Sequence, residues 1–421
     1  MAHELLRLAT AGSVDDGKST LVGRLLHDTA SILADTLDAI ERVSRDRGGA
    51  AAAPDLALLT DGLRAEREQG ITIDVAYRYF ATPARSFILA DTPGHVQYTR
   101  NMVTGASTAE LALILVDARA GVVEQTRQHA AISALLGIRH IALVVNKMDL
   151  VGFDQAVFDR IRAEFRAYAA AHGVLDVLAI PISALDGDNV VTRSEHTPWY
   201  PGPTLLEHLE SVPVGTDPTE QPLRLPVQIV IRPQDPEHRD YRGYAGRVAA
   251  GRVTVGDEIE VCPSGLRSRV VGIDTYDGPL AWAQAGQSVT LRLAEDIDIS
   301  RGDLIAGAGS APAATKEVSA TVTVLADDSL TPGQRLLLKS GTRTVPAVVA
   351  GIDNRLDVDT MDVHREVDRL ALNDIGQVRL RLGQAMVFDA YTDIRATGSF
   401  LLIDAQTGAT VAAGMIRGAL G

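Results

Sequence analysis

The sequence is poor in the features that mark secreted, disulfide-stabilised and membrane-spanning proteins. Its single cysteine, Cys262, excludes an internal disulfide bond and suits a reducing compartment. It has no apolar run of about 18 residues and no leader-like apolar stretch near its N-terminus, so neither membrane insertion nor secretion is expected. The sequence therefore predicts a cytoplasmic protein with no membrane partner.

Basic and aromatic residues are also scarce. The 421 residues include 40 lysines and arginines against 54 aspartates and glutamates, which gives a formal net charge of −14. That balance argues against broad contact with a nucleic-acid backbone, and an aromatic content of 4% leaves few side chains for stacking on bases. The histidines form no H-x-x-x-H pair or His/Cys cluster, so no structural zinc site is expected.

A complete phosphate-binding loop follows the apolar run Leu5–Ala9. Residues 12–19 read G-S-V-D-D-G-K-S, the pattern in which glycines let backbone N–H groups wrap a phosphate. Lys18 is expected to reach the outer phosphates, and the Ser19 hydroxyl to bind Mg²⁺. Helical spacing from Thr20 to Leu26 places the phosphates at a helix N-terminus. The predicted phosphate-binding residues are Gly12, Ser13, Val14, Asp15, Asp16, Gly17, Lys18, Ser19 and Thr20.

A second motif predicts that the base is guanine. The β-branched run Ile141–Val145 is typical of a strand buried on both faces, and it ends in N-K-M-D at 146–149. The Asp149 carboxylate can accept from the ring N–H and the exocyclic amine of guanine, a pair that adenine lacks. The stem of Lys147 can lie over the base, and Asn146 can tie this loop to the phosphate loop. The predicted base-binding residues are Asn146, Lys147, Asp149 and the later turn Ser183, Ala184 and Leu185.

Two further segments are expected to sense the γ-phosphate. The strand-like run Ser86–Ala90 ends in D-T-P-G-H, where Asp91 can hold Mg²⁺ through water and the Gly94 N–H can bond the γ-phosphate. Thr72, in R-E-Q-G-I-T-I, can complete the Mg²⁺ shell only with GTP bound. Both segments would then be ordered by GTP and released on hydrolysis. The predicted GTP contacts here are Asp91, Thr92, Pro93, Gly94 and His95, and the predicted Mg²⁺ ligands are Ser19, Thr72 and Asp91.

The pattern of apolar residues predicts a P-loop GTPase domain of the α/β class followed by two small antiparallel β-barrels. Up to about Val214, short apolar runs alternate with helical stretches, as in a mostly parallel sheet flanked by helices. From Leu223 onward, short strands alternate with Gly and Asp turns, and a turn-rich stretch at 309–314 separates two such blocks. The predicted domains are 1–214, 223–312 and 316–419.

These motifs resemble those of the translation-factor GTPases, of which elongation factor Tu is the familiar example. His95 after D-x-P-G is similar to the histidine that positions the attacking water in that class, and G-I-T-I with Thr72 is similar to its first switch. The resemblance implies GTP hydrolysis with His95, Thr72, Gly94 and Lys18 as the catalytic residues. A purely structural role for His95 in a solvent-facing loop is the alternative.

Smaller features of the same region allow more than one interpretation. Val14 and Ile71 resemble the apolar gate that holds the histidine outside until a partner docks, or they are ordinary packing residues. Arg64 and Arg67 could supply an arginine finger, although the charge pattern favours a solvated helical run. Asp15 keeps a position that the resemblance associates with a monovalent cation, so a K⁺ site is compatible with the sequence.

Nearly the whole chain more specifically resembles the GTPase subunits of bacterial sulfate adenylyltransferases (ATP sulfurylases). The segments that carry this likeness are 12–19, 65–80, 97–102, 197–200, 241–246 and 296–303. The chain has no second phosphate loop and no S-G-G-x-D-S stretch. The resemblance therefore implies that a separate, ATP-pyrophosphatase-like catalytic subunit makes adenylyl sulfate from ATP and sulfate, while GTP hydrolysis drives that synthesis in sulfate assimilation. Some relatives carry an adenylyl-sulfate kinase domain after the barrels, which is not expected in a sequence ending at Gly421.

An elongation factor-like GTPase that delivers tRNA to the ribosome is the alternative interpretation. Such a protein needs basic and stacking surfaces on its barrels. The acidic balance, the low aromatic content and the long segments that resemble the sulfate enzyme favour the first interpretation.

Overall fold

The chain divides into two units, residues 1–215 with 358–361 and residues 216–357 with 362–421. The computed structural model describes residues 5–29, 56, 75–92, 102, 105–138, 140–171, 176–213, 218–233, 241–357 and 362–419. None of the helices in these ranges combines the length and apolar composition that a bilayer span requires. The predicted domain limits 1–214, 223–312 and 316–419 stay predictions.

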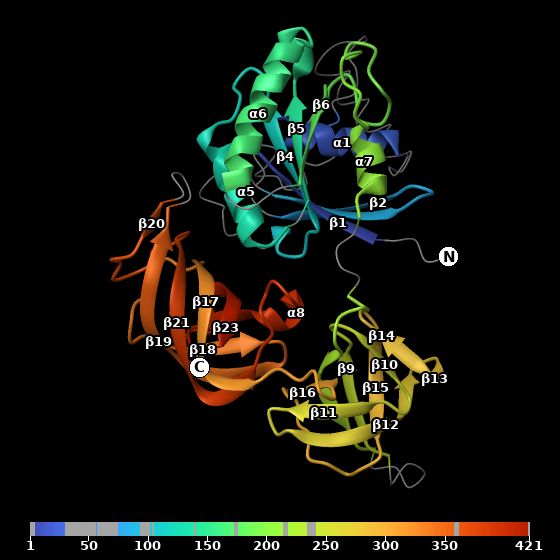
Figure 1. Ribbon diagram of the computed structural model, residues 1–421, viewed down its shortest axis with the longest axis vertical. Helices are drawn as coiled ribbons and strands as arrows, with labels where there is room; N and C mark the ends of the chain where they lie inside the picture. Colours follow the sequence, from blue (N-terminus) through green and yellow to red (C-terminus); the bar gives the residue numbers. More distant parts are fainter. Residues whose placement is uncertain are drawn as a thin grey trace. The chain divides into compact units, whose positions relative to one another are not determined.

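The first unit is built on a six-stranded sheet with the order β2-β3-β1-β4-β5-β6, shown in Figure 1. Strands β3, β1, β4, β5 and β6 are parallel, and only β2 runs against its neighbour β3. The elements are β1 Leu5–Ala11, α1 Lys18–Asp28, β2 Ala76–Ala81, β3 Ser86–Asp91, β4 Leu111–Asp117, α5 Glu124–Leu135, β5 His140–Asn146, a 3-10 helix Met148–Val151, α6 Gln155–Ala171, β6 Val177–Pro181 and α7 Leu205–Ser211.

Helices cover both faces of this sheet. Figure 1 shows α5 and α6 on one side and α1 and α7 on the other. Leu21 and Leu25 of α1 and Leu209 of α7 share one buried cluster with Leu6 and Leu113 from the sheet. The central strand β4 is buried along its whole length, because apolar helices pack on both of its faces. The predicted mostly parallel sheet with flanking helices is confirmed.

The second unit contains two antiparallel barrels. Its elements are β7 Arg224–Pro226, β8 Ile229–Ile231, β9 Gly243–Arg247, β10 Arg252–Thr254, β11 Glu258–Cys262, β12 Leu266–Thr275, β13 Gly278–Leu280, β14 Trp282–Gln284, β15 Ser288–Leu293, β16 Leu304–Gly307, β17 Ala314–Val324, β18 Arg335–Ser340, β19 Arg343–Leu356, β20 Val363–His364, β21 Ile375–Val387, α8 Arg395–Gly398, β22 Ser399–Ile403 and β23 Thr410–Ala419.

The two larger sheets of this unit close on themselves, and β10 and β14 form a separate two-stranded sheet. The first follows the path β7-β16-β11-β12-β15-β9-β8, and β7 and β8 are consecutive parts of segment 224–231, so the ends of the path meet. In the second, the path β18-β22-β23-β17-β21-β19 is closed by pairing of β18 with β19. The short strand β20 pairs with the end of β19. Each barrel encloses its own apolar cluster, as closure requires. The two predicted β-barrels are confirmed.

A buried ion pair joins the two barrels. Arg224 of β7 is 3% exposed, and its Nε and Nη2 each donate to an Asp389 carboxylate oxygen at 2.9 Å. The same Nη2 donates to the Ser310 carbonyl at 2.8 Å, and Thr397 donates its hydroxyl to Asp389 at 2.5 Å. Every oxygen of the carboxylate therefore has a partner, which a buried charge requires. This contact fixes the barrels against each other.

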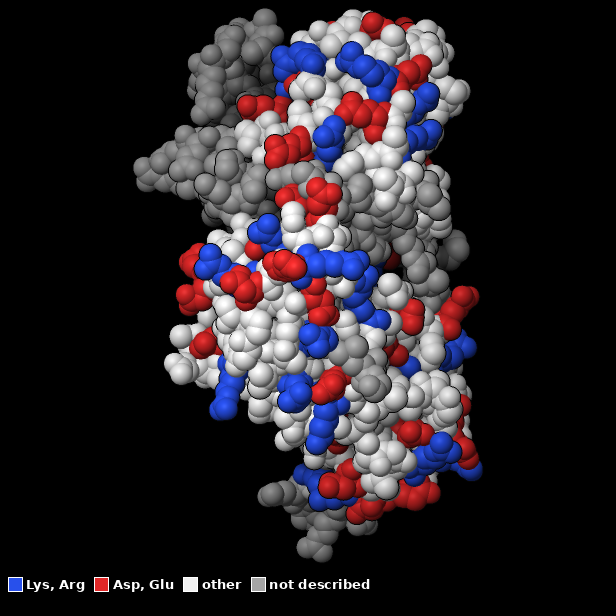
Figure 2. Space-filling model, turned by 60° about the vertical axis from the view of Figure 1, so that its left-hand side comes forward, with Lys and Arg blue, Asp and Glu red and all other residues white. Residues whose placement is uncertain are grey.

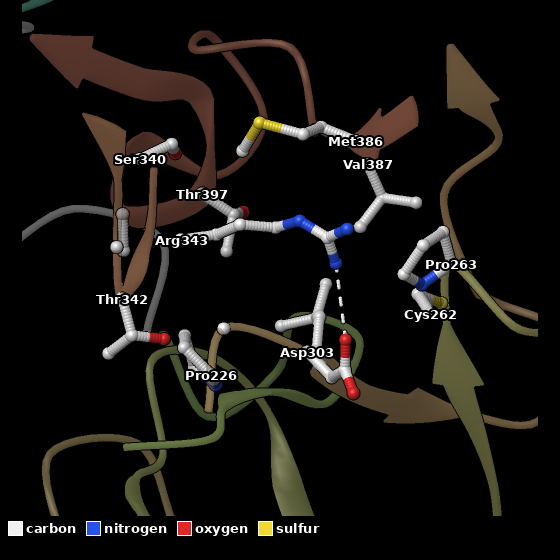
Figure 3. Close-up of a pocket in the computed structure, with 14 residues that line it drawn as sticks. Pro226, Cys262, Pro263, Asp303, Ser340, Thr342, Arg343, Met386, Val387 and Thr397 are labelled. Carbon is white, nitrogen blue, oxygen red and sulfur yellow. Dashed lines mark hydrogen bonds and ion pairs between the residues drawn. The ribbon is translucent and has the colours of Figure 1, made fainter. Parts of the chain in front are cut away.

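A pocket lies at the same seam, and Figure 3 shows side chains from both barrels around it. Arg343 of the second barrel points across the pocket and forms an ion pair with Asp303 of the first at 3.1 Å. Cys262 lines the wall, where burial raises the pKa of its thiol to about 11. Because the thiolate is the reactive form, this cysteine is a packing residue at neutral pH.

The surface mixes the two signs of charge. On the described part of the face in Figure 2, acidic and basic side chains are interspersed. Several form pairs, such as Arg379 with Asp353 at 2.8 Å on the second barrel.

Candidate functional site: a nucleotide-binding edge of the sheet

The nucleotide-binding motifs predicted from the sequence meet at one edge of the sheet in the first unit. Strands β3, β1, β4, β5 and β6 are neighbours and run in the same direction. Their carboxyl ends therefore share one edge, where α/β proteins bind ligands. The phosphate loop follows β1, Asp91 ends β3, Asn146 ends β5, and Ser183 follows β6. Four segments distant in sequence thus contribute to one site.

The phosphate loop has backbone conformations that favour glycine. Gly17 has φ +89°, and a Cβ atom there would lie 2.4 Å from Nδ2 of Asn146. Gly12 has φ +154°, and its Cβ would meet the Leu115 carbonyl oxygen at 3.1 Å. These contacts explain why the loop begins and ends in glycine, since any larger residue would push it away from the neighbouring strands. Asp15, at the tip, also has a positive φ of 66°.

Lys18 is the first residue of α1, and its side chain turns back across the loop. The Nζ atom donates to the carbonyl oxygens of Gly12 at 2.9 Å and Ser13 at 2.8 Å. Burial lowers the pKa of Lys18, and the carboxylates of Asp91 and Asp16 oppose that shift. The ammonium group is thus held by two carbonyl oxygens of the loop, where a phosphate needs a cation.

The groups proposed to hold Mg²⁺ are oxygen donors, which suit this hard cation. The buried Asp91 carboxylate accepts from the Thr10 hydroxyl at 2.7 Å, and the Thr92 hydroxyl donates to the Thr10 carbonyl at 2.5 Å. Ser19 is half-buried in the first turn of α1. Among the described residues, no group of three or more His, Cys, Asp or Glu side chains forms a metal cage.

Asn146 connects three loops of the site. Its Nδ2 donates to the Asp16 carbonyl at 2.8 Å, and its Oδ1 accepts from the Ala184 N–H at 2.9 Å. These bonds form the link that the sequence suggested between the phosphate loop and residues 146–149, here called the base loop. They also tie the base loop to the turn after β6. In that turn Ser183 and Ala184 are buried, whereas Leu185 is exposed.

Lys147 and Asp149 follow Asn146 in the base loop. Lys147 has a positive φ of 62°, and its Nζ lies 3.0 Å from Oδ2 of Asp117 and also donates to the Asp15 carbonyl. Asp149 is half-buried in the first turn of the 3-10 helix. Its position leaves a carboxylate at the sheet edge beside the loops that Asn146 joins.

Three residues of this edge were missed in the sequence analysis. Asp117 ends β4, and Arg119 donates to its carboxylate from Nη2 at 2.6 Å and Nε at 3.0 Å. Gln125 of α5 accepts a hydrogen bond from the Ser13 hydroxyl of the phosphate loop. A usable signal existed for Asp117, because it ends an apolar strand just as Asp91 does. No comparable pattern identifies Arg119 or Gln125.

Several predicted residues lie outside the part of the chain that the structure describes. They are Thr72, Pro93, Gly94 and His95, together with Arg64, Arg67 and Ile71. Their roles as Mg²⁺ ligand, water-positioning group, arginine finger and gate therefore stay predictions. Val14 and Thr20 are described and half-buried, and Asp15 is exposed. The binding of GTP and K⁺ by these residues likewise stays a prediction.

The chain matches two family models. Residues 3–213 match the elongation factor Tu GTP binding domain, and residues 317–417 match the GTP-eEF1A C-terminal domain-like family. The first match spans the sheet and the whole edge described above. It agrees with a guanine-nucleotide site at that edge.

Three curated relatives match nearly the full chain. The bifunctional enzyme CysN/CysC of Mycobacterium tuberculosis (strain ATCC 25618 / H37Rv) is 58% identical over 98% of this chain and 67% of its own length. Sulfate adenylyltransferase subunit 1 is 52% identical in both Cellvibrio japonicus and Aeromonas salmonicida, over 98% of this chain and 86% of each relative. The phosphate loop, the N-K-M-D loop that is predicted to bind guanine, and these relatives lead to one assignment. The chain belongs to the sulfate adenylyltransferase subunit 1 family, within the elongation factor Tu class of GTPases.

Proposed function

We propose that this chain is the GTP-hydrolysing subunit of a sulfate adenylyltransferase. A separate, ATP-pyrophosphatase-like subunit makes adenylyl sulfate and pyrophosphate from ATP and sulfate, and GTP hydrolysis by this chain drives that synthesis in sulfate assimilation. The observation that carries the proposal is the convergence of the phosphate loop, Asp91 and the base loop at one sheet edge, in a chain of this family.

The geometry supports hydrolysis by positioning and electrostatics, which is how proteins catalyse phosphoryl transfer. The phosphate loop and Lys18 hold the outer phosphates and supply positive charge, as the contacts of the Lys18 ammonium with the loop suggest. Ser19 and Asp91 are the described residues that would hold Mg²⁺, the latter through water, and Thr72 completes the set with GTP bound. Bound Mg²⁺ neutralises charge that develops on the phosphates.

The attacking water is assigned to the segment after Asp91. His95 orients this water or accepts part of its proton, while the Gly94 N–H binds the γ-phosphate. Asp15, exposed at the loop tip with its backbone in a left-handed conformation, is the candidate for a bound K⁺. The roles of Gly94 and His95 require residues 91–95 to close over the nucleotide only in the GTP state.

Coupling to sulfate activation follows from a general constraint. Adenylyl sulfate contains a mixed anhydride, so its formation from ATP and sulfate is uphill. A GTPase shifts that balance only if the states of the partner differ in affinity for the GTP-bound and GDP-bound switches. The catalytic subunit is therefore expected to contact the face that carries Thr72 and residues 91–95.

Affinity purification from the source cells tests the partner directly. The tagged full chain is expected to co-purify with one protein carrying the S-G-G-x-D-S signature of ATP-pyrophosphatases, and the purified pair should make adenylyl sulfate. A tagged catalytic subunit should retrieve this chain in return. Recovery of ribosomes and tRNA in place of such a protein would instead support the delivery of tRNA.

A further inference from the structure

A charged network joins the end of β4 to the predicted base loop. The Asp117 carboxylate accepts hydrogen bonds from Arg119 Nη2 at 2.6 Å and Arg119 Nε at 3.0 Å. It also forms an ion pair with Lys147 Nζ at 3.0 Å. The backbone N–H of Arg119 donates to the same carboxylate at 2.9 Å. Burial raises the pKa of Asp117, but the bonds from Arg119 and Lys147 outweigh it and hold the pKa well below its usual range.

This network constrains Lys147. The residue has a left-handed backbone with φ 62°, a conformation that residues other than glycine rarely adopt unless neighbouring contacts hold them there. Its ammonium group is held between the Asp117 carboxylate and the Asp15 carbonyl of the phosphate loop. The lysine stem thus spans the gap between the base loop and the phosphate loop. Without Asp117, the ammonium group would lose its only carboxylate partner among the described residues.

The same carboxylate orients Arg119. The Arg119 side chain is 54% exposed, and a long exposed side chain samples many rotamers unless hydrogen bonds hold it in one of them. The Asp117 carboxylate accepts two such bonds, from Nη2 and Nε. The bonds with Asp117 raise the pKa of Arg119, and the negative charge of Asp149 acts on it in the same direction. Arg119 in turn holds the Asp117 carboxylate through the same two bonds.

We propose that Asp117 is a positioning residue for guanine-nucleotide binding, which Arg119 holds in place and which in turn holds Lys147 beside the base. The inference rests on the guanine-binding role proposed for the base loop. Asp117 acts at the base end of the site, away from the γ-phosphate. Its loss should therefore affect GDP and GTP alike, and should change binding rather than the hydrolysis step.

The test uses the Asp117→Asn protein, which keeps the shape of the side chain and removes its charge. Dissociation constants for fluorescent GDP and GTP should both rise by about 10-fold to 100-fold, the scale seen when an outer residue that orients a ligand is removed. KM for GTP should rise while kcat changes less than about twofold. The matched control is Asp159→Asn, which breaks an exposed Asp159–Arg162 pair of 2.8 Å on α6 and should change neither constant.

A double-mutant cycle separates positioning from general destabilisation. In a Lys147→Met background, Asp117→Asn should cost less than about threefold in GDP affinity, because the side chain that Asp117 positions is already absent. An equal loss in both backgrounds, unchanged affinities in the single variant, or a lower kcat at unchanged KM would overturn the inference. If the parent protein itself binds no guanine nucleotide, the proposed function fails instead.

A second variant keeps the inference testable if Asp117→Asn does not fold. Arg119→Met removes an exposed side chain and leaves the Asp117–Lys147 pair in place. GDP and GTP affinity should each fall by about threefold or more, because the Asp117 carboxylate loses two of the bonds that hold it in place. Parent-like affinity would contradict the role given to Arg119.

Discussion

Replacing Asp149 by asparagine is expected to weaken GTP binding by about 3–5 kcal/mol, the scale expected when a site loses the polar partner of its ligand. The carboxylate is predicted to accept from the ring N–H and the exocyclic amine of guanine. An asparagine side chain has one acceptor and one donor, so one guanine N–H would face another N–H. The same donor suits the second carbonyl of xanthine, so the variant should bind xanthosine triphosphate better than the parent does.

Calorimetric titration of both nucleotides measures this change of specificity. The Asp159→Asn protein again serves as the control, because Asp159 lies on α6 in an exposed ion pair and not at the sheet edge. GTP affinity that is unchanged in Asp149→Asn would refute the assignment of the base loop. A loss of GTP affinity without a gain for xanthosine triphosphate would point to misfolding of the loop rather than to a change in its hydrogen bonds.

The His95→Ala protein is expected to bind GTP nearly as well as the parent and to hydrolyse it roughly 10²-fold more slowly or worse. The imidazole is assigned to the attacking water, and it contacts neither the base nor the phosphates in this account. Its loss should therefore lower kcat and leave the dissociation constant almost unchanged.

Single-turnover hydrolysis in the presence of the catalytic subunit isolates the chemical step. The matched control is His27→Ala, which removes a half-buried histidine near the C-terminal end of α1, where its Nδ1 lies 2.7 Å from Asp28. Parent-like stimulated hydrolysis in His95→Ala would mean that another group orients the water. Arg64 and Arg67 would then be the next residues to replace.

The fold was largely accessible from local patterns. The glycine spacing of the phosphate loop needs a strand before it and a helix after it, and β1 and α1 stand there. Short strands separated by Gly and Asp turns also form a local pattern, and this pattern indicated the barrels. The closure of the first barrel was not accessible, because it depends on segment 224–231 pairing with β16 at one end and β9 at the other. Such pairings join residues far apart in sequence and leave no local signature.

Site residues could be predicted from the sequence only where they belong to a recognisable motif. Asp91 and Asn146 end parallel strands within known patterns, and parallel strands bring their carboxyl ends together. Asp117 ends β4 in the same way, but a lone aspartate after an apolar run has no pattern that names its partner. Its partner Lys147 lies on the neighbouring strand's loop, so the pair became visible only once β4 and β5 were placed side by side.

GTP hydrolysis by this chain is proposed to drive the synthesis of adenylyl sulfate. The most direct measurement follows adenylyl sulfate and GDP together in the reconstituted complex, with GTP, with a non-hydrolysable GTP analogue and without guanine nucleotide. We expect adenylyl sulfate to accumulate beyond the ATP-only equilibrium only with GTP and in proportion to GDP formed. We expect Thr72→Ala to abolish that excess, because Thr72 is predicted to sense the γ-phosphate. The same yield of adenylyl sulfate with and without GTP, or an unchanged yield per GTP hydrolysed in Thr72→Ala, would contradict switch-mediated coupling.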